Sequence, residues 1–174
     1  MKNYLVVVDM QKDFIDGVLG TSEAVEIVEK IVEKMRTFDG EVIFTRDTHF
    51  DNYLETQEGK YLPVPHCKKG SSGWQLQERI AAVKPENAKI FDKNTFASVE
   101  LASYLSEVNE KEGIEQITFV GVCTDICVIS NAMLVKAYMP EVEIVIDAKC
   151  CAGVTPKSHN NALEAMKMCQ IIIV

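Results

Sequence analysis

Two cysteines, Cys123 and Cys127, lie in a segment that joins an apolar run to a helical pattern. We expect Cys127 to fall near the first turn of that helix, where backbone N–H groups and the helix dipole lower the pKa of a thiol. The same N–H groups can hold a developing oxyanion. A nucleophilic thiol needs this arrangement, but most free cysteines are small buried apolar residues, and the position alone favours that simpler explanation.

An acid and a lysine can complete a nucleophilic site. Asp9 follows the apolar residues 5–8, so its carboxylate should be partly desolvated and able to pass a thiol proton to a leaving amine. Lys93 ends the run 89–92 and can keep a thiolate charged. Asp9 could instead cap a strand or form a salt bridge, and Lys93 could be a solvated surface lysine. With both beside Cys127 at one sheet edge, we favour the nucleophile.

A second constellation has the composition of a metal site. Asp47 and His49 are two residues apart, and His66 follows in the same segment. A mixed set of imidazole and carboxylate ligands suits zinc, manganese or iron. A pair of surface histidines would give the same composition. The third histidine, His159, is predicted at the start of a surface helix and is assigned no role.

Short apolar runs alternate with helical periodicity along the chain. The runs predict strands at 5–8, 42–44, 88–91, 117–120, 142–146 and 171–174. Helices are predicted after the caps Thr21-Ser22, Ser98 and Thr155-Pro156, and from the fourth strand to about residue 138. The first helix should bury the stripe Val25, Ile27, Val28, Ile31, Val32 and Met35. Residues 46–89 are mostly loop with a weak helix at 75–83, and a loop of that length is usually functional.

This alternation predicts a three-layer, Rossmann-like α/β domain over residues 1–174, with a mostly parallel six-stranded sheet and helices on both faces. Ligands bind at the carboxyl ends of strands in such sheets. Asp9, Asp47, Lys93 and Cys127 all follow or end strands, so the fold should deliver them to one edge. No strand is followed by a G-x-G-x-x-G sequence, which disfavours a dinucleotide cofactor.

Net charge, hydrophobicity and cysteine content limit the kinds of partner and compartment that we expect. The 174 residues carry 18 basic and 26 acidic side chains, a net charge of −8, which disfavours nucleic acid as a partner. The apolar run at the N-terminus is too short for a secretory segment or a bilayer span, so we expect a cytoplasmic protein without membrane contact. The six cysteines are then expected to be free thiols. Apolar helix faces leave a homo-oligomer open.

Two stretches carry a resemblance to the isochorismatase-like cysteine hydrolase superfamily, and within it to the nicotinamidases (pyrazinamidases). Residues 8–14, V-D-M-Q-K-D-F, resemble the D-x-Q-x-D-F opening, and residues 121–128, G-V-C-T-D-I-C-V, resemble the G-x-x-T-D-x-C-V nucleophile turn. The resemblance covers nearly the whole chain and implies an Asp9–Lys93–Cys127 triad on an isochorismatase-like hydrolase fold. It also implies a cis peptide before Cys123 and an oxyanion hole formed by the amides of Cys123 and Cys127.

The D-x-H and P-x-H-C patterns resemble the nicotinamidase metal site. This resemblance implies Asp47, His49 and His66 as ligands of a divalent metal, with zinc expected and manganese or iron as alternatives. Some members use a further histidine in the intervening loop, and this chain has none there. Other members use glutamate, which points to Glu58, with Glu55 in reserve.

The resemblance implies an amidohydrolase that acts on linear, non-peptide C–N bonds. Its small-molecule substrate would be nicotinamide or a similar aromatic carboxamide, cleaved to the acid and ammonia through a thioester on Cys127, in NAD salvage. In that family the metal binds the ring nitrogen, and Phe14 and Phe96 would flank the ring. Both phenylalanines could equally be core residues, and Trp74 has no matching role.

Three alternatives stay open. The chain could hydrolyse another amide or a ureido or carbamoyl compound, although relatives of that kind generally lack the full metal set. It could be a non-catalytic binding protein, against which the intact triad argues. It could be a thiol redox protein, but the chain has no C-x-x-C pair, and adjacent cysteines seldom close a disulfide without strain. No role is assigned to Cys67, Cys150, Cys151 and Cys169.

Overall fold

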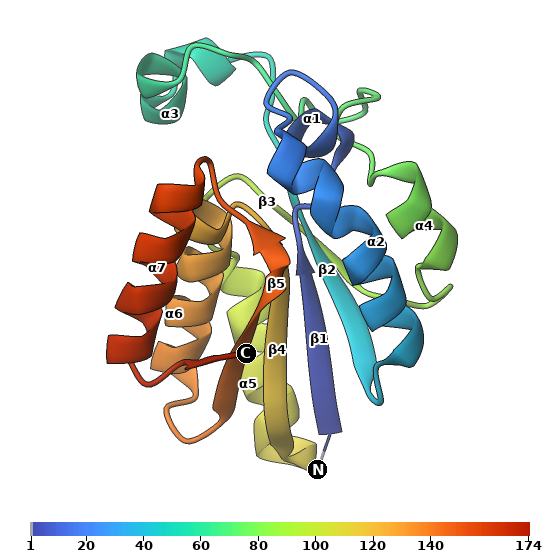
Figure 1. The fold of residues 1–174 in the computed structure, drawn as a ribbon, viewed down its shortest axis with the longest axis vertical. Coiled ribbons are helices and arrows are strands. Elements are labelled where there is room, and N and C mark those ends of the chain that lie inside the picture. The colour runs from blue at the N-terminus through green and yellow to red at the C-terminus, as the bar shows by residue number, and fades with distance from the viewer. Residues whose placement is uncertain (1) are drawn as a thin grey trace.

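A six-stranded parallel sheet forms the centre of the computed structural model, which describes residues 2–174 (Figure 1). The strand order is β3-β2-β1-β4-β5-β6, and every neighbouring pair is parallel. The strands are β1 Lys2–Val8, β2 Glu41–Asp47, β3 Ile90–Lys93, β4 Ile114–Val122, β5 Glu143–Ala152 and β6 Ile172–Ile173. The predicted parallel α/β architecture is confirmed.

Helices cover both faces of this sheet (Figure 1). The helices are α1 Lys12–Ile15, α2 Ser22–Thr37, α3 Gln57–Tyr61, α4 Glu78–Val83, α5 Val99–Glu112, α6 Ile129–Tyr138 and α7 Pro156–Met168, with the short turns η1 Tyr53–Glu55 and η2 Thr124–Val128. One buried apolar cluster lies under α5, α6 and α7, and a second lies under α2 and α4. No helix within residues 2–174 is long and apolar enough to cross a bilayer.

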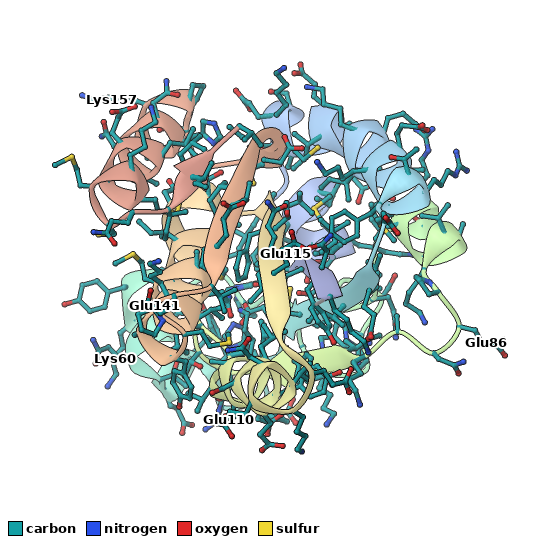
Figure 2. All side chains as sticks on the ribbon, turned by 90° about the horizontal axis from the view of Figure 1, so that it is seen from below. Lys60, Glu86, Glu110, Glu115, Glu141 and Lys157 are labelled. Atoms are coloured by element: carbon teal, nitrogen blue, oxygen red, sulfur yellow. The ribbon has the colours of Figure 1, made fainter. Side chains whose placement is uncertain are left out.

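Charged side chains project away from these two cores. Lys60, Glu86 and Lys157 come from different parts of the chain and extend outward at the rim of the molecule (Figure 2). All three are exposed, as charged side chains on a protein surface usually are.

The observed strands differ in length from the predicted ones. The predicted first strand, 5–8, lies within the buried part of β1, which begins at Lys2 because its first residues also pair with neighbouring strands. The predicted third strand, 88–91, lies two residues later as β3, where Lys93 pairs with Asp47. β5 runs well beyond the predicted 142–146 because, after an irregularity, Cys151 and Ala152 still pair with β4.

Helix α2 confirms one prediction and corrects another. The side chain of Thr21 accepts a hydrogen bond from the N–H of Ala24 at 3.1 Å, so the predicted cap is present. Val25, which was predicted to lie on the buried stripe, is 51% exposed, whereas Val28 is 4% exposed. The buried face follows three- and four-residue spacing from Ala24, and Val25 lies outside it.

The segment between β2 and β3 contains short elements that carry little sequence signal. Its predicted weak helix, 75–83, is confirmed as the shorter α4, capped by the side chain of Gln77. Helices α1 and α3 were not predicted, because a helix of four or five residues is too short to show helical periodicity.

Val28 and Val25 form a matched pair that tests the packing of α2. Val28→Ala removes two methyl groups from a buried position, and we expect it to lower the free energy of unfolding by about 2 kcal/mol. Val25→Ala removes the same atoms from an exposed position, so we expect a change within about 0.5 kcal/mol. Urea unfolding followed by circular dichroism measures both values, and equal losses would contradict the assigned helix face.

Candidate active site

The strand order brings the predicted site residues together. Strands β3, β2, β1 and β4 are neighbours, and their carboxyl ends carry Lys93, Asp47, Asp9 and the turn that contains Cys127. The register aligns these ends, since Asp47 pairs with Lys93 and Val8 pairs with Gly121. Parallel strands therefore deliver side chains from four distant parts of the chain to one edge.

Lys93 lies between the acid and the thiol. Its Nζ atom is 2.7 Å from Oδ2 of Asp9 and 3.5 Å from Sγ of Cys127. All three residues are buried, and Asp9 has no exposed surface at all. The other carboxylate oxygen of Asp9 accepts a 2.6 Å hydrogen bond from the hydroxyl of Thr45, a residue that sequence reasoning did not identify.

Burial dominates the protonation of this group. Burial raises the pKa of the Asp9 carboxyl, and the charge of Lys93 offsets only part of that rise. Burial also raises the pKa of the Cys127 thiol well above its usual value, again against the opposing effect of Lys93. The expectation of a lowered thiol pKa is therefore wrong for this resting state. A nearby base must take the proton if the sulfur is to attack.

Four side chains form the predicted metal cluster. Donor atoms of Asp47, His49, Glu58 and His66 all lie within 4.8 Å of one another. Nε2 of His49 is 2.9 Å from Oδ2 of Asp47 and 3.6 Å from Oε1 of Glu58. Nε2 of His66 is 3.4 Å and 3.7 Å from the same two atoms. Glu55 lies outside this cluster and is exposed.

The donor set fits a divalent cation. Two imidazole nitrogens and two carboxylate oxygens are the ligand types that divalent transition metals accept. Nδ1 of His66 is 2.8 Å from the carbonyl of Val64, so if Nδ1 donates there, Nε2 is left free to bind a metal. Burial alone would raise the pKa of Asp47. Hydrogen bonds from His49 and His66 nevertheless hold this pKa below its ordinary value, so Asp47 is a carboxylate.

Two further residues hold the cluster in place. Gln11 accepts from the N–H of Asp47 at 2.7 Å and donates to its carbonyl at 2.8 Å, which fixes the backbone of this ligand. The ring of Tyr53 packs edge-on against both imidazoles, with ring centroids 4.6 Å from His49 and 5.1 Å from His66. Gln11 belongs to the D-x-Q-x-D-F motif and could have been identified from it, whereas Tyr53 carries no sequence signal.

One cavity is lined both by the thiol of Cys127 and by residues of the metal cluster. Its volume is about 270 Å³, and its lining includes Cys127, Asp47, Glu58 and His66. Phe14 and Phe96, the two residues that the resemblance would place beside a substrate ring, also line it, and the ring of Phe14 packs edge-on against His66 at 5.4 Å. The remaining wall is largely apolar, so the cavity suits a flat uncharged ring with one polar group.

The nucleophile turn begins with the cis Val122–Cys123 peptide that the resemblance implied. The carbonyl of Cys123 accepts from the N–H groups of Ile126 and Val128, each at 3.0 Å. Within residues 2–174, the N–H of Cys123 itself donates to no other group. The turn therefore offers a free donor beside the thiol of Cys127, as an oxyanion site requires.

Asn131 holds the backbone of the nucleophile Cys127 and was not identified from the sequence. Its side-chain N–H groups donate to the carbonyls of Cys127 at 2.8 Å and Phe96 at 3.1 Å. Its side-chain oxygen accepts from the N–H of Ser98 at 2.9 Å. One buried amide thus links the nucleophile to the loop that carries Phe96.

Six residues had no predicted role, namely His159, Trp74, Cys67, Cys150, Cys151 and Cys169. His159 is half-buried rather than on an open surface, because its Nδ1 atom lies 2.7 Å from the hydroxyl of Thr124. Trp74 donates its ring N–H to Thr48 at 2.9 Å and stacks under Arg46, which makes it a support for the loop after β2. The six cysteines, including the adjacent Cys150 and Cys151, are unpaired.

Residues 3–174 match the isochorismatase domain family. A curated relative, an uncharacterized isochorismatase family protein PncA from Bacillus subtilis, is 28% identical over 175 residues, which cover 94% of this chain and 93% of the relative. The crystal structure of nicotinamidase/pyrazinamidase PncA from B. subtilis superposes with a TM-score of 0.84 at 25% identity, with full coverage of both chains. The structure of a Pyrococcus horikoshii pyrazinamidase in complex with zinc gives 0.81 at 26% identity, covering 100% and 99%.

Glu58 and Glu55 test the proposed fourth ligand as a matched pair. We expect Glu58→Gln to weaken zinc binding by more than about tenfold, because loss of even an outer partner of a ligand costs about that much. Glu55→Gln changes an exposed carboxylate outside the cluster, so its affinity should equal that of the unaltered protein. Competition with a fluorescent zinc chelator measures both. Equal affinity in the two variants would remove Glu58 from the site.

Proposed function

The chain belongs to the isochorismatase domain family, and we propose that it is a cysteine amidohydrolase that converts nicotinamide, or a similar aromatic carboxamide, to the acid and ammonia. One observation carries the proposal: Cys127, which lies beside Lys93 and Asp9, lines the same apolar cavity as Asp47, Glu58 and His66 of the metal cluster. The similarity to nicotinamidase and pyrazinamidase structures over the whole chain supports the substrate class.

The first half of the proposed reaction forms a thioester. Asp9 takes the proton of Cys127, and its raised pKa makes it a stronger base than an ordinary aspartate. Lys93 stays positively charged beside the sulfur and stabilises the thiolate as it attacks the amide carbon. The N–H groups of Cys123 and Cys127 hold the oxyanion. Asp9 then protonates the nitrogen, the C–N bond breaks, and ammonia leaves.

The second half regenerates the thiol. Water attacks the thioester carbon, Asp9 accepts a proton from this water, and the C–S bond breaks. The acid leaves, and the proton returns to the sulfur of Cys127. Each turnover consumes one water and one amide and releases one acid and one ammonia.

The cluster of Asp47, His49, Glu58 and His66 would hold a divalent metal, for which we propose zinc. When bound, the metal supplies a Lewis acid that can accept the ring nitrogen of a pyridine carboxamide. The edge-on contact between Phe14 and His66 places an aromatic wall beside that position, and Phe96 lines the same cavity. These contacts favour a flat aromatic amide over a flexible aliphatic one.

We propose that residues 1–174 form a single hydrolase domain and that it works in the cytoplasm, in NAD salvage. The family match over residues 3–174 and the single sheet support one domain. Six unpaired cysteines support a reducing compartment.

Ammonia release tests this function. We expect the zinc-loaded protein to release ammonia from nicotinamide and to lose that activity with a chelator. Maleamate and a carbamoyl amine should react much more slowly. Cys127→Ala should abolish turnover because it removes the nucleophile, whereas Cys169→Ala, at an exposed position, should leave turnover unchanged.

The outcomes separate chemistry from substrate. Turnover of another amide with nicotinamide inert would overturn the substrate assignment and keep the cysteine mechanism. Activity in Cys127→Ala would overturn the mechanism itself. A metal-loaded protein that cleaves no amide would favour a binding protein on the same fold.

A further inference from the structure

The connection between β5 and α7 and the first turns of α7 each make one contact with the nucleophile turn. The carboxylate of Asp125 accepts from the N–H of Val154 at 3.1 and 3.2 Å. The hydroxyl of Thr124 lies 2.7 Å from Nδ1 of His159. Both Thr124 and Asp125 stand between Cys123 and Cys127, whose N–H groups form the proposed oxyanion site.

The contact between Thr124 and His159 satisfies a buried hydroxyl group. Thr124 has no exposed surface, and a buried hydroxyl without a partner costs free energy. His159 is the one hydrogen-bond partner of this hydroxyl within residues 2–174. Removal of the imidazole would therefore leave a buried polar group unpaired inside the turn, and the turn would shift to satisfy it.

His159 is itself held firmly. Its backbone N–H donates to the carbonyl of Thr155 at 2.9 Å in the first turn of α7. Gly153 lies so close that a Cβ atom there would meet the Cβ of His159 at 2.9 Å, so α7 packs directly on this glycine. Burial lowers the pKa of His159, and the opposing effect of Asp125 is smaller. The lowered pKa keeps the imidazole neutral at pH 7.

We propose that His159 is a positioning residue for the oxyanion site: through the hydroxyl of Thr124 it holds the turn that presents the N–H groups of Cys123 and Cys127. This inference rests on the proposed function and deepens it. Neither His159 nor Thr124 lines the cavity that holds Cys127, so His159 acts through the turn and not on the substrate.

The geometry of an oxyanion site explains why such a support matters. Its donors must lie about 2.7–3.1 Å from the oxyanion in the transition state. A misplacement of about 1 Å can cost roughly 100-fold in rate. Substrate binding depends instead on the cavity wall and the metal cluster, and His159 packs behind Gly153 of that wall without lining the cavity itself. Loss of His159 should therefore lower kcat and leave KM nearly unchanged.

Three substitutions of His159 test the proposal by steady-state kinetics on nicotinamide. We expect His159→Ala to lower kcat by about 10- to 100-fold with KM within about twofold. Asparagine places a polar atom where Nδ1 stood, so His159→Asn should retain kcat within about threefold. Glutamine places its amide one atom farther out, and His159→Gln should behave like alanine. Asn160→Ala, an exposed change on the same helix, is the control.

A second readout separates the oxyanion site from the thiol. Pyridine-3-carbaldehyde adds to a thiolate and forms a tetrahedral adduct that carries an oxyanion, whereas iodoacetamide alkylates the thiolate without forming one. In His159→Ala we expect the aldehyde adduct on Cys127 to weaken by about tenfold or more. The rate of alkylation by iodoacetamide should stay within about twofold of the unaltered protein.

Three results would overturn the proposal. The first is unchanged kcat and aldehyde affinity in His159→Ala. The second is an equal loss of alkylation and aldehyde binding in that variant, and the third is an equal loss of kcat in the asparagine and alanine variants. The second and third would show general damage to the fold. If the unaltered protein releases ammonia from no amide, the proposed function fails, and the aldehyde and iodoacetamide measurements still decide the role of His159.

Discussion

The buried charge of Lys93 constrains the whole site. Its ammonium is almost fully enclosed, and it lies 2.7 Å from Asp9, 3.6 Å from Asp47 and 3.5 Å from the sulfur of Cys127. A buried charge without partners costs several kcal/mol, so the carboxylates must arrive from the adjacent strands. The net charge of this group is −2 when the carboxylates of Asp9, Asp47 and Glu58 and the ammonium of Lys93 are all ionised. A divalent cation would offset that charge. The lysine thus joins the thiol chemistry to the metal cluster.

The sheet and the nucleophile turn divide the work of positioning. Strand register fixes Asp9, Asp47 and Lys93, because these residues end or directly follow paired strands. Cys127 instead lies on a turn outside the sheet, and side-chain contacts must hold it. Asn131 of α6 donates to the carbonyl of Cys127, and the hydroxyl of Thr124 lies beside Nδ1 of His159 on α7. Strand register therefore positions Asp9 and Lys93, whereas side-chain contacts outside the sheet position the nucleophile.

Sequence reasoning recovered what local pattern encodes. Apolar runs marked the strands because strands of a parallel sheet are buried on both faces, and their ends then placed Asp9 and Lys93. The resemblance, not the pattern, supplied the roles of the triad and the cis peptide before Cys123. Contacts such as that of Asp9 with Thr45 join residues 36 positions apart, and no local pattern encodes them. Val25 was misplaced because its apolarity alone does not fix the helix face.

Trapping with hydroxylamine tests the thioester on Cys127 most directly. Hydroxylamine competes with water for a thioester, so added hydroxylamine should change the product from nicotinate to nicotinohydroxamate. Ammonia release measures the rate of thioester formation. Where that step limits turnover, the rate of ammonia release should stay unchanged. Direct attack of water on the amide forms no such intermediate. Nicotinate as the sole acyl product at every hydroxylamine concentration, with ammonia still released, would contradict covalent catalysis by Cys127.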